Sequence, residues 1–306
     1  MLQVIGIVLP IFTVIGLGKA AVHWRVFDAV ATANLTKFAV YFLIPALTFG
    51  IIAEARPANV TAFSLAYLAG CSMIYLLGLA ATGWFEHPTI GHRAVFALDA
   101  VWSNAVFLGT PLISAVWGTE GLGYLVGIMV SSTAFLPMSV ALMEVDASTK
   151  SGSTIITGVL ISLVRNPIIV STVLALAWRL AVLPVPLPLH MLIELLGRCA
   201  APVGLFCLGM SLPQMTREVV REAAVCSVLK LLVMPVVVGV ICYLVGFTGT
   251  PLSVAVLVAA MPTGANAFLI ARGTTRFGDS SATTVVLATF LSMITLPILL
   301  YLMVRI

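Results

Sequence analysis

Ten long apolar segments, separated by short polar joints, account for almost all of this 306-residue chain. A helix needs about 20 mostly apolar residues to cross the hydrocarbon core of a bilayer, and each segment is about that long or longer. The chain is 61% hydrophobic and 8% charged, whereas soluble domains carry roughly 25% charged residues. We therefore expect an all-α integral membrane protein in the lipid bilayer. Its ten predicted transmembrane helices lie at 4–22, 29–53, 60–83, 93–117, 121–143, 155–182, 188–212, 220–246, 251–271 and 281–304.

The Lys and Arg residues are distributed unequally between the two sets of joints. One set of joints holds only Arg56, Arg179 and Arg305, whereas the other set holds ten. Two more, Arg198 and Lys230, lie inside segments. Because the side rich in Lys and Arg faces the cytoplasm, both termini are expected to be extracytoplasmic. The small net charge of +4 is spread over many joints, so it does not indicate a nucleic-acid surface. The expected cytoplasmic set is Lys19, Arg25, Lys37, Arg93, Lys150, Arg165, Arg217, Arg221, Arg272 and Arg276.

Several landmarks recur in the same order in the two halves of the chain. Pro10 and Pro45 are 35 residues apart, as are Pro167 and Pro202. We expect two five-helix repeats, at 1–146 and 147–306, within a single membrane domain. An odd number of spans in each copy places the second copy upside down, which is the inverted-repeat architecture of many secondary transporters.

The fourth and ninth segments hold residues that a lipid-facing helix would not. Interrupted segments at corresponding positions of two halves are a pointer to a transporter binding site. Because inversion makes the two segments run in opposite directions, their interruptions are expected to cross near the middle of the membrane. The two stretches are Asn104-Ala-Val-Phe-Leu-Gly109-Thr110-Pro111 and Pro262-Thr263-Gly264-Ala265-Asn266.

Such a crossing would suit a carboxylate. A broken helix leaves main-chain N–H groups unsatisfied, and its N-terminal end favours negative charge. Asn104 and Asn266 add neutral donors, while Gly and Pro suit the interruptions. The predicted substrate-binding set is Asn104, Gly109, Thr110, Pro111, Pro262, Thr263, Gly264 and Asn266. The alternative is a pair of packing kinks, because membrane helices tolerate Gly and Pro.

Three further polar features lie inside segments. A carboxylate within a span is costly and marks a transport pathway by default, so Asp99 is a candidate for proton or ion coupling. A structural pairing with Arg93, six residues earlier, is the alternative. Glu194 and Arg198 are spaced to pair on one helix face. Lys230 has no obvious partner, and contact with a transport pathway is one role open to it.

The chain resembles the auxin efflux carrier family, in its short bacterial form. The resemblance covers essentially all ten segments and is carried by Leu-Ile-Pro45-Ala-Leu, Arg165-Asn166-Pro167, Ala-Ala-Pro202 with Leu-Gly-Met-Ser-Leu, and Asn266-Ala-Phe. It implies a carrier of two inverted repeats, with a scaffold part and a mobile part, similar in fold to bile-acid/sodium symporters. It also implies crossed fourth and ninth helices with a Pro and an Asn at each crossing. Here Pro111 follows Asn104 by seven residues whereas Pro262 precedes Asn266, which leaves open which residue marks the fourth break.

The family is expected to move carboxylates: auxin in plants, malate or malonate in bacteria. We therefore predict a secondary transporter of small organic anions in the plasma (bacterial inner) membrane, with H⁺ or Na⁺ as candidate coupling ions and a homodimer implied by the resemblance. The alternative is a sodium-coupled symporter of larger amphipathic acids. Neither ATP use nor an enzyme is expected, since the sequence lacks a Gly-rich phosphate loop and paired acids. The five Cys are interpreted as apolar helix residues, so neither a cofactor nor a metal is predicted.

Overall fold

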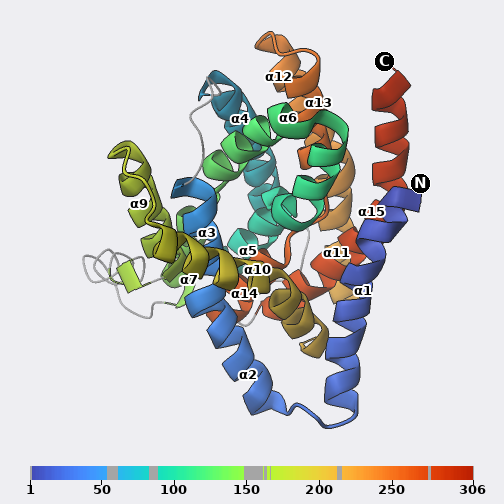
Figure 1. The fold of residues 1–306 in the computed structure, drawn as a ribbon. Coiled ribbons are helices and arrows are strands. Elements are labelled where there is room, and N and C mark those ends of the chain that lie inside the picture. Colours follow the sequence, from blue (N-terminus) through green and yellow to red (C-terminus); the bar gives the residue numbers. More distant parts are fainter. Residues whose placement is uncertain are drawn as a thin grey trace.

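The computed structural model describes residues 2–53, 61–82, 89–147, 161, 164–165, 167–211, 216–274 and 277–305. Over these residues the chain is helical apart from short joints and an isolated two-residue bridge (Figure 1). The predicted all-α class is therefore confirmed. The first half contains α1 (Leu2–His23), α2 (Ala29–Phe38), η1 (Ala39–Leu43), α3 (Ile44–Ala53), α4 (Thr61–Ala81), α5 (Ile90–Val101), η3 (Ala105–Gly109), α6 (Thr110–Ser132) and α7 (Phe135–Ala147). The second contains α9 (Pro167–Leu180), α10 (Leu187–Met210), α11 (Arg217–Val228), η4 (Leu229–Val233), α12 (Met234–Leu244), α13 (Thr250–Ala259), α14 (Ala265–Thr274) and α15 (Gly278–Arg305).

Six of the described helices are long and apolar enough to cross a membrane, which makes the chain a multi-pass membrane protein. Three further apolar helices are shorter, at Phe12–His23, Ile169–Leu180 and Thr250–Ala259. Most of the predicted sixth segment before residue 164 lies outside the described residues. The count of ten spans and the inverted repeat therefore stay predictions. The six long helices are Ala29–Ala53, Thr61–Ala81, Leu112–Ser132, Leu187–Met210, Arg217–Leu244 and Gly278–Met303.

Two of the long helices contain a wide π-helical turn directly before a proline. The turn η1 precedes Pro45, and the turn η4 precedes Pro235. Proline has no N–H and its ring clashes with the carbonyl four residues earlier, so an ordinary α-helical turn would be strained there. A π-turn widens the helix at that point. Both helices therefore continue past their prolines.

The helices form two groups that meet along one face. In the first, which we call the α10 group, α10 contacts α1, α2, η1 and α3, and α9 packs on α3. In the second, the α5 group, α4 and α7 pack on α5, and α6 packs on α4 and α13. Helices α11, α12, α14 and α15 complete this group. The groups touch where α10 and η1 contact α14, where α3 contacts α6, and where α1 contacts α15 (Figure 1). The candidate site lies at this junction.

Glycines let α1 and α10 approach closely. A Cβ atom on Gly18 would lie 2.2 Å from the carbonyl oxygen of Phe206, and one on Gly209 would lie 2.0 Å from that of Ile15. Real side chains do not come so near to backbone atoms, so both positions need glycine. Small residues that let backbones approach are the usual basis of helix packing in membranes.

Candidate functional site

The fourth predicted segment is interrupted between α5 and η3. Helix α5 ends at Val101, and Trp102 (φ −81°, ψ 93°) is extended. Asn104 (φ −74°, ψ 56°) is also non-helical, and the helix resumes at Ala105. Pro111 lies further on, in the first turn of α6, so it does not mark this interruption. Side-chain contacts of Pro111 are outside the described part of the chain.

The ninth segment is interrupted between α13 and α14. Helix α13 ends at Ala259. The last main-chain hydrogen bond before the gap runs from the Met261 N–H to the Val258 carbonyl. Pro262 follows and has no N–H to continue the ladder. The helix resumes at Ala265. Here the proline does lie in the interruption.

The two interruptions cross and pair with each other. The Asn104 N–H donates to the Pro262 carbonyl at 2.8 Å, and the Gly264 N–H donates to the Trp102 carbonyl at 2.9 Å. Ser103 and Thr263 thereby form an antiparallel bridge. Unpaired main-chain N–H and carbonyl groups are costly in a bilayer, and each interruption supplies hydrogen-bond partners for some of these groups in the other. The expected meeting of the two interruptions is thus observed.

Neighbouring helices hold the crossing from behind. The Thr263 hydroxyl donates to the carbonyl of Asp99 at 2.7 Å. The ammonium of Lys230, on η4, donates to the Ser103 hydroxyl at 2.7 Å and to the carbonyl of Ala259 at 2.8 Å. The Lys230 side chain is fully buried. It therefore places a positive charge against the C-terminal end of α13, where the helix dipole favours cations.

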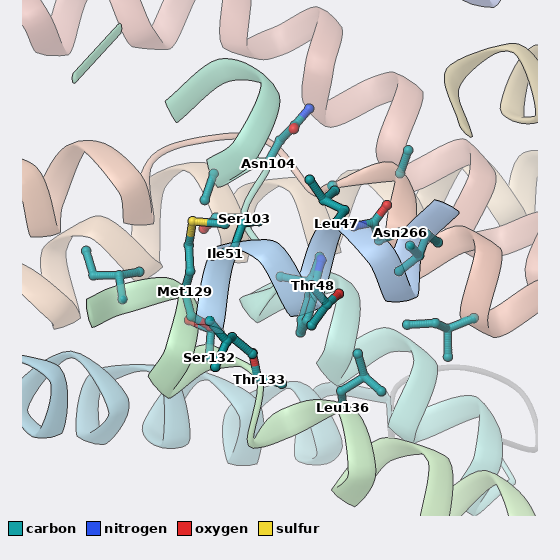
Figure 2. A pocket seen from close by; sticks show the side chains of 18 residues that line it. Leu47, Thr48, Ile51, Ser103, Asn104, Met129, Ser132, Thr133, Leu136 and Asn266 are labelled. Carbon is teal, nitrogen blue, oxygen red and sulfur yellow. The ribbon is translucent and has the colours of Figure 1, made fainter. Parts of the chain in front are cut away.

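A cavity of about 70 Å³ opens beside the crossing, at the junction of the two helix groups (Figure 2). That is room for several water molecules or part of a small ligand. Asn104, Gly264 and Asn266 line it, as do the first helical residues after each gap, Ala105 and Ala265. The N-terminal ends of η3 and α14 thus both border the cavity, and such ends favour anions. The Asn104 side chain makes no cap bond to its own helix, which leaves its amide available to a ligand.

The structure places the predicted site residues in four positions. Asn104, Gly264 and Asn266 line the cavity, and we call this the central cavity. Pro262 and Thr263 are buried in the crossing itself. A Cβ on Gly264 would lie 3.1 Å from the Trp102 ring, so the close crossing favours glycine there. Gly109 packs against Met261 behind the crossing, whereas Thr110 lines a different cavity.

Sequence reasoning missed the other walls of the central cavity. Thr48 on α3 contributes a hydroxyl from the α10 group, and Ser132 and Thr133 contribute hydroxyls where α6 ends. Leu47 and Ile51 complete an apolar wall (Figure 2). Ser131-Ser132-Thr133 is a polar run inside an apolar segment, a signal that could have marked this wall.

Two larger cavities flank the central one. A cavity of about 580 Å³ is lined by the charged residues Asp28, Lys37, Arg165 and Arg272, and it shares Ile270 with the central cavity. Three of its charged residues belong to the set expected to be cytoplasmic, so we call it the basic cavity. A cavity of about 840 Å³ is lined by Thr110, His190, Glu194 and Arg198, and it shares Leu47, Ile51 and Met129 with the central cavity. We call it the opposite cavity. The predicted pairing of Glu194 with Arg198 is confirmed by a direct side-chain contact.

Asp99 lies on α5 outside the central cavity. Only 2% of the residue is exposed, and its carboxylate accepts a hydrogen bond from the Ser281 hydroxyl on α15 at 2.7 Å. No hydrogen bond or ion pair joins Asp99 to Arg93, the residue proposed as its structural partner, within the described part of the chain. Asp99 therefore stands within the α5 group, one hydrogen bond away from the crossing through its own carbonyl.

Interrupted helices that cross at a buried cavity, within a multi-pass helical protein, define a membrane transporter. The chain matches the model of the membrane transport protein family over residues 3–300 and belongs to that family, the one that includes the auxin efflux carriers. It is 25% identical to the "Putative malonate transporter" of Rhizobium meliloti over 99% of this chain and 96% of that protein. It is 24% identical to the "Uncharacterized transporter YfdV" of Escherichia coli K12 over 87% of each chain. It is 22% identical to the "Probable auxin efflux carrier component 5c" of rice over 97% of this chain and 95% of that protein.

Proposed function

We propose that this protein is a secondary transporter that moves small organic anions across the plasma membrane. The substrates are carboxylates, such as malate, malonate or auxin-like acids. The observation that carries the proposal is the central cavity, where Asn104, Asn266 and two helix N-terminal ends converge. Both amide side chains and both helix ends favour a negatively charged oxygen ligand. The names of the relatives support a carboxylate substrate.

Alternating access is proposed from the arrangement of the three cavities. Ile270 alone is shared by the basic and central cavities, and three apolar residues are shared by the central and opposite cavities. A modest shift of the α5 group against the α10 group would open one boundary and close the other. In this proposal the α10 group is the scaffold and the α5 group carries the site. The basic cavity then faces the cytoplasm, and its Lys37 and Arg165 attract anions toward the site.

The second candidate is a sodium-coupled symporter of larger amphipathic acids. It requires carboxylate and carbonyl ligands for Na⁺ beside the crossing. Among the described residues, the group that contacts the crossing carbonyl of Ala259 is the Lys230 ammonium, which would repel Na⁺. That observation favours the first candidate. A homodimer through the α10 group is a further part of the proposal and is tested by mass determination in detergent.

Transport is tested with the purified full-length protein in proteoliposomes. Vesicles loaded with unlabelled malonate should exchange it for external labelled malonate, and excess malate or an auxin-like acid should compete. A thermal-shift screen against mono- and dicarboxylates should show stabilisation by the transported class, because ligand binding stabilises the native state. Exchange that is absent for every small carboxylate would overturn the proposal, and Na⁺-dependent uptake of larger amphipathic acids in its place would support the second candidate.

A further inference from the structure

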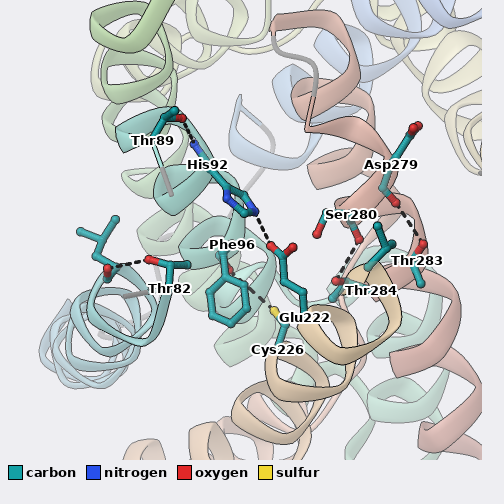
Figure 3. Close-up of polar contacts among 12 residues, drawn as sticks. Thr82, Thr89, His92, Phe96, Glu222, Cys226, Asp279, Ser280, Thr283 and Thr284 are labelled. Atoms are coloured by element: carbon teal, nitrogen blue, oxygen red, sulfur yellow. Dashed lines mark hydrogen bonds and ion pairs between the residues drawn. The ribbon is translucent and has the colours of Figure 1, made fainter. Parts of the chain in front are cut away.

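Ionisable side chains follow the interface of α5 with α11 and η4 through the interior of the α5 group. Helices α5 and α11 run side by side, and contacts recur about every turn. His92 meets Glu222, then the Cys226 thiol contacts the carbonyl of Phe96, and finally Lys230 reaches Ser103 at the crossing. Figure 3 shows the outer part of this row of side chains. We call it the α5–α11 seam.

The outer end of the seam is the pair of His92 and Glu222. The imidazole Nε2 and the carboxylate Oε1 are 2.5 Å apart, and the two side chains are 13% and 10% exposed. The His92 ring stacks on Phe277, with ring centres 4.7 Å apart. His92 lies in the first turn of α5 and Glu222 in the second turn of α11, close in sequence to Arg93 and Arg221 of the expected cytoplasmic set. The pair is thus the part of the seam nearest to water.

The middle of the seam is Asp99. It lies on the same face of α5 as His92, seven residues further along, and interacts electrostatically with Glu222. Cys226, one turn beyond Glu222 on α11, points its thiol at the carbonyl of Phe96 on α5. Ser281 holds the Asp99 carboxylate in place. A carboxyl group this deeply buried is costly as an anion and accepts a proton with little rearrangement of its neighbours.

We propose that Asp99 is the proton-coupling site of this carrier and that Glu222 and His92 conduct the proton between Asp99 and the basic side of the protein. This inference rests on the proposed transport of a carboxylate. When one anion enters the central cavity from the opposite side, one proton from the same aqueous phase binds to the Asp99 carboxylate and makes it a neutral carboxyl group. The proton leaves to Glu222 and then to the His92 imidazole after the anion is released. No covalent bond to the substrate forms.

Charge balance within the α5 group is the reason for this coupling. With the cavity empty, the Lys230 ammonium and the Asp99 carboxylate cancel. A bound anion adds one negative charge, which a proton on Asp99 removes, so the loaded and empty states bury the same net charge. Moving an unbalanced charge through the membrane interior is costly. For a dicarboxylate, the proton cancels one of its two charges.

Of the ionisable groups on α5 and on the helices packed around it, Asp99 is the one best placed to bind and release the coupled proton. On its own helix the nearest ionisable group along the seam is His92. Helix α11 contributes Glu222 and Cys226, and η4 contributes Lys230. Helix α15 offers the neutral Ser281, and its Asp279 pairs with Arg272 of α14 at the exposed end. Other helices that contact α5 carry Asp146 on α7, which accepts from Thr89, and Tyr67, Cys71 and Tyr75 on α4. Arg217, Glu218 and Arg221 lie near the start of α11, and Tyr301 lies near the end of α15.

The experiment compares exchange with gradient-driven accumulation in proteoliposomes whose membrane potential is clamped to zero. Malonate is the labelled probe, and a dye inside the vesicles reports internal pH. For one proton per transported anion, with the membrane potential at zero, a gradient of about one pH unit supports about tenfold accumulation. The wild type should show this accumulation and a pH change that depends on malonate. Asp99→Asn should keep exchange at equal pH but lose both the accumulation and the pH change, because an amide still accepts from Ser281 but cannot take up the proton.

The relay is tested with Glu222→Gln and His92→Gln. Both should slow gradient-driven accumulation several-fold while leaving exchange near the wild-type rate. Glu120→Gln is the matched control, because it replaces a carboxylate that is exposed on α6 and lines none of the three cavities. It should leave both measurements unchanged.

Each contrary result is decisive. Gradient-driven accumulation that persists in Asp99→Asn would overturn the inference, as would a wild type whose exchange is normal but ignores the pH gradient. Loss of exchange in folded Asp99→Asn would assign Asp99 to substrate binding instead. Absence of exchange in the wild type would overturn the proposed function, and the inference with it.

Discussion

Ser103 and Thr263 face each other across an antiparallel bridge, and each carries a second bond that ties this bridge to a helix behind it. The Ser103 hydroxyl accepts from Lys230 of η4, whereas the Thr263 hydroxyl donates to the carbonyl of Asp99 on α5. Two helix interruptions that would be costly alone therefore stabilise each other. The buried Lys230 also bonds to the crossing. Two packing kinks that met by accident would need neither the paired main chains nor this buried charge.

The cavity amides should be essential for transport. Asn104→Ala and Asn266→Ala each remove a donor that faces the central cavity, and we expect each to reduce malonate exchange by about tenfold or more. Folding should be intact, as judged by gel filtration and thermal unfolding in detergent. Asn34→Ala is the matched control, because Asn34 is exposed on α2. Normal exchange by both cavity variants would remove the proposed site.

The charge under the crossing should contribute to anion affinity. Lys230→Met keeps the length of the side chain but removes its ammonium, so we expect malonate to bind about tenfold more weakly, which is about 1.4 kcal/mol. Because the group is buried, salt should screen this contribution little. The measurement is a malonate titration followed by thermal shift. Lys37→Met, in the basic cavity, should change the affinity less and in a salt-dependent way; equal effects of the two variants would contradict this assignment.

The contact between α1 and α10 should not tolerate a methyl group. Gly18→Ala and Gly209→Ala would each force the two backbones apart, and we expect a loss of about 1–3 kcal/mol in stability. Gly16→Ala on the same helix meets nothing within 4 Å. It should be neutral or stabilising, because alanine is the better helix former. Thermal unfolding in detergent gives the comparison, and equal midpoints for Gly16→Ala and Gly209→Ala would refute the close approach.

A buried hydrogen bond should couple α4 to α7. The hydroxyls of Tyr75 and Ser139 are 2.8 Å apart, and both residues are buried. Ser139→Ala leaves the tyrosine hydroxyl without this partner, so we expect a loss of about 1 kcal/mol. Tyr75→Phe together with Ser139→Ala should lose less than the sum of the single changes. A double-mutant cycle by thermal unfolding measures this coupling, and strictly additive losses would show that the bond contributes nothing.

The position of the fourth interruption shows what sequence patterns could not decide. Gly109 and Pro111 are the residues in that segment that usually break helices, yet the gap lies earlier, at Trp102 to Asn104. Proline at the start of a helix needs no broken bond, because the first turn has free N–H groups in any case. The gap is instead placed by hydrogen bonds to the ninth segment, a partner that is distant in sequence.

The sequence by itself determined that the chain is a helical membrane protein, because long runs with few charges can be stable only as helices in a bilayer. It also indicated the two segments that carry Asn104 and Asn266, since polar residues in such runs are costly and stand out against their neighbours. Only the tertiary structure decided that Asn104, Asn266, Thr48 and Ser132 share one cavity and that Lys230 lies beneath the crossing. Those relationships depend on how distant helices pack. Hydrophobic periodicity does not contain that information, because in a membrane nearly every face of a helix is apolar.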